Sequence, residues 1–116
     1  MADLRDVSKR LNAASDHLTR CYALEEEKLR AANLGLEVWV PFTKDCEIGY
    51  AKCGGTWQLA IRHTGQFVSP LHNESRIIRM LGVKALPDIE AQLCVEAEVL
   101  AAKIEAELEE RSDDSN

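Results

Sequence analysis

The sequence lacks any long apolar run. No stretch approaches the roughly 20 consecutive apolar residues of a membrane-spanning helix. The first residues, Met1 to Asp6, likewise contain no apolar segment of the kind found in signal peptides. We therefore expect a cytoplasmic protein that has no contact with membranes.

Motifs for known kinds of chemistry are also missing. The sequence contains no phosphate-binding loop, no nucleophile elbow, no paired metal-binding cysteines and no zinc-protease motif. It therefore predicts no catalytic residue, no metal ligand and no cofactor, although the lack of a motif does not exclude an enzyme.

Cysteines are few, but their even number raises the question of disulfide bonds. The four are Cys21, Cys46, Cys53 and Cys94. Cys46 and Cys53 are seven residues apart along one extended segment, so they face opposite sides and lie beyond disulfide reach. In a cytoplasmic protein, reduced thiols are the default state.

Basic side chains are fewer than acidic ones. The 14 Lys and Arg residues stand against 20 Asp and Glu, which gives a formal net charge of −6. The excess lies at the C-terminal end, where residues 88–116 carry ten acidic side chains against Lys103 and Arg111. Because nonspecific nucleic-acid binding depends on Lys and Arg neutralising phosphates, we expect no nucleic-acid partner.

The sequence does contain enough apolar residues for one core. Its 116 residues are 46% hydrophobic and 29% charged, which is typical of a single globular domain. We expect one α+β domain over residues 1–111 and a frayed acidic tail over residues 112–116.

A long N-terminal helix is predicted between Asp3 and Asn33, a stretch without helix breakers. Apolar residues recur along it in steps of three and four, and the stripe moves to another face near Glu25. We expect the helix to change its packing partner there. The stripe consists of Leu4, Val7, Leu11, Ala14, Leu18 and Cys21, and then of Tyr22, Leu29 and Ala32.

Alternating apolar residues predict three strands, at 36–42, 47–53 and 56–62. Gly54 and Gly55 separate the last two and suit a tight hairpin turn. A three-stranded antiparallel meander with one buried face follows, and the helices must cover that face.

Two further helices are predicted after the meander. Residues 73–86 show helical spacing, and residues 88–110 form a long acidic helix with one apolar face. Pro87 lies between them and predicts a kink or a break, because proline disfavours helical geometry at the preceding residue and suits the start of a new helix. We expect this short helix and the long C-terminal helix to pack on one face of the sheet together with the N-terminal helix.

A basic cluster is the clearest candidate for a binding site. It could hold a carboxylate, a phosphate or an acidic peptide through guanidinium groups. The alternative, which we favour, is that Arg76 and Arg79 pair with acids such as Glu96, Glu98 or Glu105 of the last helix, in the same chain or in a partner subunit. The candidate anion-binding residues are Arg62, His63, His72, Arg76 and Arg79.

The apolar faces of the two long helices exceed what one small sheet can bury, so we expect a homodimer. Trp39 lies on the opposite face of its strand from Val38, where it packs under a helix or contacts a protein partner. The candidate interaction residues are Leu4, Leu11, Leu18 and Trp39.

Weaker candidates for chemistry involve cysteine. His17 and Cys21 are four residues apart and could present two metal ligands on one helix face, but Cys21 also continues the apolar stripe. Cys46 near Lys44 and Cys53 near Lys52 could each be a nucleophile. Ordinary cysteines at strand ends explain both.

Two classes of function remain. The first, which we favour, is a noncatalytic interaction module, such as an adaptor, a regulator or a phage-type inhibitor, that is dimeric. The second is a small-molecule or anion-binding module, or an enzyme, that uses Arg62, Arg76 and Arg79.

Overall fold

Two long helices and one antiparallel sheet make up the fold, which a computed structural model describes for residues 3–64 and 67–114. The predicted α+β class is confirmed. In chain order the elements are α1 (Leu4–Ala32), β1 (Val38–Thr43), β2 (Cys46–Cys53), β3 (Thr56–His63), β4 (Val68–Pro70), the short 3-10 helix η1 (Leu71–Asn73) and α2 (Arg76–Asp114).

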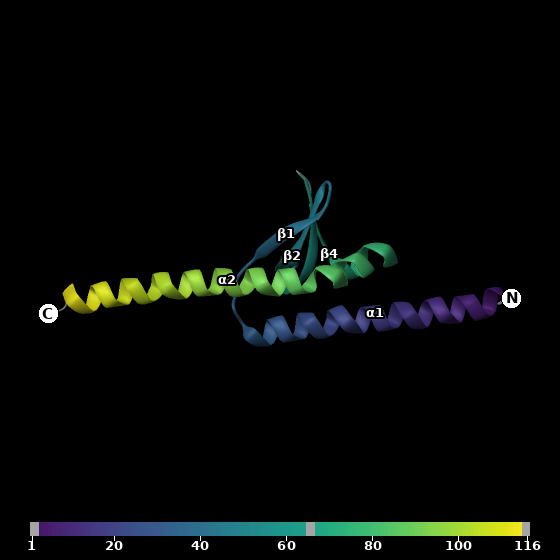
Figure 1. The fold of residues 1–116 in the computed structure, drawn as a ribbon, viewed down its shortest axis with the longest axis horizontal. Helices are drawn as coiled ribbons and strands as arrows, with labels where there is room; N and C mark the ends of the chain where they lie inside the picture. The colour runs from purple at the N-terminus through teal and green to yellow at the C-terminus, as the bar shows by residue number, and fades with distance from the viewer. Residues whose placement is uncertain (1–2, 65–66, 115–116) are drawn as a thin grey trace.

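Both helices lie on the same side of the sheet and run in the same direction, but they are offset along their axes (Figure 1). The N-terminal end of α1 extends past the start of α2, and the C-terminal half of α2 extends past the end of α1. The molecule is consequently elongated, with extents of 80 × 30 × 23 Å. Over the described part of the chain, neither helix combines the length and apolar content that crossing a membrane requires.

The sheet has four strands in the order β1-β2-β3-β4, not the three that the sequence predicts. The missed strand, β4, has only three residues and pairs antiparallel with β3 from Ala60 to Arg62. A segment this short is below the length at which alternation can be recognised, and it ends in Pro70, which is typical of loops.

Of the kink or break predicted at Pro87, the break is wrong, because α2 is one continuous helix of 39 residues that contains this proline. The short helix at 73–86 and the long helix from Asp88 are therefore a single element. Pro87 is exposed, while Leu86 and Ile89 on either side of it pack into the core. Their packing outweighs the hydrogen bond that proline removes.

The frayed acidic tail over residues 112–116 stays a prediction. The helix runs to Asp114, and residues 115–116 lie outside the part of the chain that the structure describes.

The core lies between the helices and one face of the sheet, as the period-two pattern predicts. Cross-strand neighbours on this inner face are buried, and the shifted part of the α1 stripe packs on them. The fully or nearly buried core residues are Tyr22, Leu29, Val38, Val40, Ile48, Tyr50, Leu59, Ile61, Leu71, Ile89 and Leu93.

The predicted hairpin turn is present between β2 and β3. Cys53 and Thr56 are paired across it, and Gly54 and Gly55 have φ angles of +58° and +85°. Both angles lie in the left-handed region, which only glycine occupies without strain.

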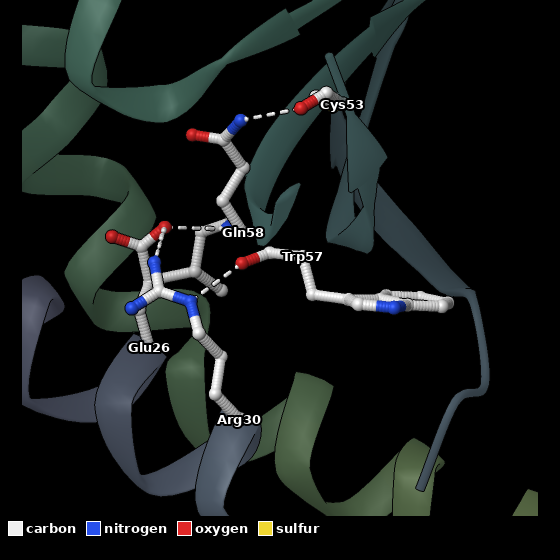
Figure 2. Close-up of polar contacts among 6 residues, drawn as sticks. Glu26, Arg30, Cys53, Trp57 and Gln58 are labelled. Atoms are coloured by element: carbon white, nitrogen blue, oxygen red, sulfur yellow. Dashed lines mark hydrogen bonds and ion pairs between the residues drawn. The ribbon is translucent and has the colours of Figure 1, made fainter. Parts of the chain in front are cut away.

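Side-chain hydrogen bonds hold helix α1 to the open edge of β3. Because β4 pairs only with the end of β3, backbone groups of Trp57 and Leu59 have no strand beside them. Oε2 of Glu26 accepts a hydrogen bond from the Leu59 N–H at 2.8 Å, and Nε of Arg30 donates to the Trp57 carbonyl at 2.8 Å (Figure 2). Glu26 is only 8% exposed, and its carboxylate lies 3.9 Å from the Arg30 guanidinium. Two side chains of α1 thus take the place of a neighbouring strand.

Replacing Gly54 and Gly55 together by valine should destabilise the hairpin. No atom lies within 4 Å of a Cβ built at either position, so the effect comes from backbone strain alone. We expect a loss of about 1 kcal/mol or more at each site. Circular dichroism melts would measure it, with Thr56→Val as an exposed control. An unchanged melting temperature would refute the left-handed turn.

Replacing Glu26 by leucine should destabilise the fold by about 1–3 kcal/mol, because the buried Leu59 N–H loses its acceptor and the exposed Arg30 loses a nearby carboxylate. Glu26→Gln keeps an acceptor oxygen and should have a smaller effect. Urea unfolding would measure both. The control is Glu27→Leu at the next, exposed position. Equal losses of stability at positions 26 and 27 would show that the hydrogen bond from Leu59 to Glu26 does not stabilise the fold.

Candidate functional site

The first apolar surface is the N-terminal arm, defined as residues 4–11 of α1. These residues precede Asn12, which accepts a hydrogen bond from Arg76 at the start of α2. Leu4 is 85% exposed, and Val7 and Leu11 are about half exposed. The arm is positive, because it carries the basic residues Arg5, Lys9 and Arg10 and the single acidic residue Asp6.

An apolar hollow continues this surface between the two helices. It has a volume of about 340 Å³, and its α2 side is formed by Arg76, Ile77 and Met80, of which Ile77 is largely exposed and Met80 about half exposed. The predicted interaction residues Leu11 and Leu18 line the hollow from α1, whereas Leu4 lies on the protruding arm beyond it.

The second apolar surface is the C-terminal arm, defined as residues 95–111 of α2. Leu100, Ile104 and Leu108 lie at helical spacing from the buried Ile89 and Leu93, so they extend the core-facing stripe beyond the sheet. Leu108 is 62% exposed. The arm is negative, because six acidic side chains outnumber the two basic ones, Lys103 and Arg111. The acidic residues are Glu96, Glu98, Glu105, Glu107, Glu109 and Glu110.

Within the chain, Arg76 and Arg79 do not pair with the acids of the C-terminal arm, so the predicted pairing is wrong for acids of the same chain. Arg76 donates to Asn12 at 3.3 Å, and Nη1 of Arg79 donates to Thr19 at 3.1 Å and to the Tyr22 hydroxyl at 3.5 Å. The reason is geometric: in a continuous helix, the first of the acids lies about 30 Å along the axis from Arg76. The two arginines fasten α2 to α1 instead.

Arg62 belongs to the outer face of the sheet, the face away from the helices. Its guanidinium lies 4.4 Å from the centre of the Trp39 ring and 2.7 Å from a carboxylate oxygen of Glu47. Trp39 is therefore half-buried beneath an arginine rather than beneath a helix. A cation over an aromatic face is a favourable arrangement, and here it joins three strands.

The two predicted histidines lie apart from each other. His63 is on the inner face, between Cys46 and Glu74. His72 lines a hollow of about 620 Å³ that includes Ala51 and Gln58. The structure thus brings Arg76 and Arg79 together, but it places Arg62 and His63 on opposite faces of β3 and His72 in η1.

Cys53, a nucleophile candidate from the sequence, lines the same hollow as His72. Burial raises the pKa of its thiol, and the negative charge of Glu37 raises it further. The thiol therefore stays protonated at neutral pH, which is unfavourable for nucleophilic attack.

Side chains of the types that can bind metal ions do not cluster in the described part of the chain. Across residues 3–64 and 67–114, no group of three or more His, Cys, Asp or Glu side chains is placed to hold a metal ion. All four cysteines are free thiols.

A polar contact holds α1 to the middle of α2. Nζ of Lys28 lies 2.8 Å from a carboxylate oxygen of Glu90, and this contact lowers the pKa of Glu90. Burial raises the pKa of Glu25, and the adjacent Glu90 raises it further. The helix interface therefore contains one carboxyl group that is easier to protonate than in water.

A comparison of the chain with protein-family models, with curated proteins and with solved structures found no match.

Replacing Glu25 by glutamine should raise stability at neutral pH. A carboxyl group whose pKa is raised on folding binds more protons in the folded state, so its contribution to stability falls as pH rises from 4.5 through the raised pKa. The amide carries no charge to desolvate, so the difference between wild type and variant should be positive at neutral pH and smaller below pH 4.5.

Melting temperatures at both pH values would measure this difference, with Glu27→Gln at an exposed position of α1 as the control. A variant whose advantage is the same at acid and neutral pH would show that Glu25 titrates normally.

Proposed function

We propose that the protein is a noncatalytic interaction module that works as a homodimer, in which the N-terminal arm of each chain packs on the C-terminal arm of its partner. The observation that carries this proposal is a pair of exposed apolar stripes with opposite charge at opposite ends of one molecule. Exposed apolar surfaces that continue a core stripe are typical of protein interfaces.

The offset of the helices supports a closed, two-fold arrangement. Because α1 and α2 run in the same direction and extend from opposite ends, a two-fold axis across the middle of the molecule places each arm beside the other arm of the partner. Both contacts then form twice, and neither arm remains free for further assembly.

Charge favours this pairing over its alternatives. An interface between two N-terminal arms would bring Arg5 and Arg10 of both chains together, and an interface between two C-terminal arms would oppose Glu105 and Glu107. Pairing unlike arms places these side chains next to opposite charges. Such complementarity sets orientation and specificity, while burial of Leu11, Ile104 and their neighbours supplies most of the affinity.

A role as an adaptor, regulator or phage-type inhibitor requires a further protein partner. The outer face of the sheet suits that contact, because the helices leave it open and it presents Trp39 with Arg62 over the ring. Trp and Arg are enriched at the energetic centres of protein interfaces.

We also propose that the protein acts in the cytoplasm. Four free thiols in one small chain suit a reducing compartment. The acidic net charge favours neither a nucleic-acid partner nor an anionic membrane surface.

A small-molecule or anion-binding role for Arg62, Arg76 and Arg79 has weaker support. Arg62 lies on the outer face with Glu47, whereas Arg76 and Arg79 bond to α1 on the helix side. No single ligand of ordinary size would contact all three.

Light scattering should give a mass twice the 13.0 kDa of the chain. Leu11→Glu and Ile104→Glu should each dissociate the dimer, because a charge would replace an apolar contact. The matched control is Leu24→Glu, at a 66% exposed leucine of α1 outside both arms, which should leave the mass unchanged.

Charge exchange identifies which arms pair. Arg5→Glu with Arg10→Glu should weaken the dimer, and adding Glu105→Arg with Glu107→Arg should restore it. A monomer at all concentrations would refute the proposal. A dimer that the charge changes do not weaken would show that another surface forms the interface.

A further inference from the structure

A thiol and an imidazole face each other at one end of the sheet. Cys46 is the first residue of β2 and His63 is the last residue of β3, and the antiparallel register pairs them directly. Sγ of Cys46 lies 3.2 Å from Nδ1 of His63. This distance is within hydrogen-bonding range for sulfur, so the thiol can donate its proton to the ring nitrogen.

The other nitrogen of the ring faces a carboxylate. Oε1 of Glu74 lies 3.7 Å from Nε2 of His63. Glu74 follows η1, and its N–H donates to the Leu71 carbonyl at 3.0 Å, so its position depends on a short, ordered helix anchored by a buried leucine. A carboxylate on this side favours the ring form that keeps its proton on Nε2 and leaves Nδ1 free to accept one.

Several hydrogen bonds to backbone groups hold Cys46 and His63 in place. The His63 N–H donates to the Phe67 carbonyl at 3.3 Å, and the two rings lie 5.1 Å apart. Thr64 donates to the Asp45 carbonyl through its N–H at 3.0 Å and through its hydroxyl at 2.8 Å. The turn before Cys46 is thereby tied to the end of β3. Cys46 itself is partly buried and packs against the core, so a small reagent is the appropriate probe for its sulfur.

We propose that Cys46 is a reactive thiol that undergoes exchange with low-molecular-weight disulfides, with His63 as its general base and Glu74 as a positioning residue. The proposal is independent of the dimer. A nucleophile, a base in contact with it and an acid behind the base form the arrangement used to activate cysteine.

The exchange can be written with every atom accounted for. Nδ1 of His63 takes the proton from the Cys46 thiol, and the thiolate attacks one sulfur of the small disulfide. The S–S bond of the reagent breaks as the bond to Cys46 forms. The departing thiolate receives the proton from His63, so one thiol and one disulfide give another thiol and a mixed disulfide.

The other three thiols provide internal comparisons. Cys94 is exposed on α2, Cys21 is partly exposed on α1, and Cys53 has a raised thiol pKa. Among the described residues, the hydrogen bonds place a histidine at Cys46 and at none of these three. If exposure alone controlled the reaction, Cys94 would react first.

The experiment exposes the folded protein to 2-hydroxyethyl disulfide, which is uncharged, and follows each cysteine by peptide mass spectrometry. Cys46 should be modified at least about tenfold faster than Cys94. His63→Ala should lower the Cys46 rate by a similar factor, and imidazole added to the buffer should restore part of it. The exposed His72 provides the control, because His72→Ala should leave the rate unchanged.

Glu74→Gln should lower the Cys46 rate severalfold, and Glu74→Asp should recover part of the loss. Unchanged Cys94 and Cys21 rates in each variant would report that the fold is intact. The proposal fails if Cys46 reacts no faster than Cys94. It also fails if a folded His63→Ala variant keeps the wild-type rate, or loses it without rescue by imidazole.

Discussion

The structure depends on how the chain satisfies the open edge of β3. The short β4 leaves the backbone groups of Trp57 and Leu59 without a strand beside them, and exposed backbone groups of this kind promote pairing with other chains. Glu26 and Arg30, one helical turn apart, bond to both groups. Because these bonds are directional and Glu26 is buried, they set the position of α1 along the sheet.

The two protruding arms follow from that position. With Glu26 fixed at β3, the N-terminal arm of α1 extends past the start of α2. At the other end, α2 is anchored through Ile89 and Leu93 and continues for several turns beyond the sheet. The apolar stripes do not stop where the sheet stops, so each arm presents core-like side chains to its surroundings. Their opposite charges are the reason that we propose a second copy of the chain as their cover.

The two ends of the β2–β3 hairpin have different characters. At the turn, Gly54 and Gly55 reverse the chain, and the nearby Cys53 thiol has a raised pKa. At the open end, the same register places Cys46 beside His63. One pairing register therefore determines both the geometry of the turn and the contact of a thiol with a base. Dimerisation and thiol exchange would use separate parts of the molecule, the helical arms and the end of the sheet.

The sequence alone determined features that depend on neighbours along the chain. Alternation located three strands, helical spacing located the stripes and their shift near Glu25, and two glycines located the turn. Tertiary structure decided the rest. Packing of Leu86 and Ile89 kept α2 continuous through Pro87, against the local preference. The pairing of β4, the bonds of Glu26 and the meeting of Cys46, His63 and Glu74 all join residues distant in sequence. Local periodicity carries no information about such contacts, because register and docking set them only when the whole core forms.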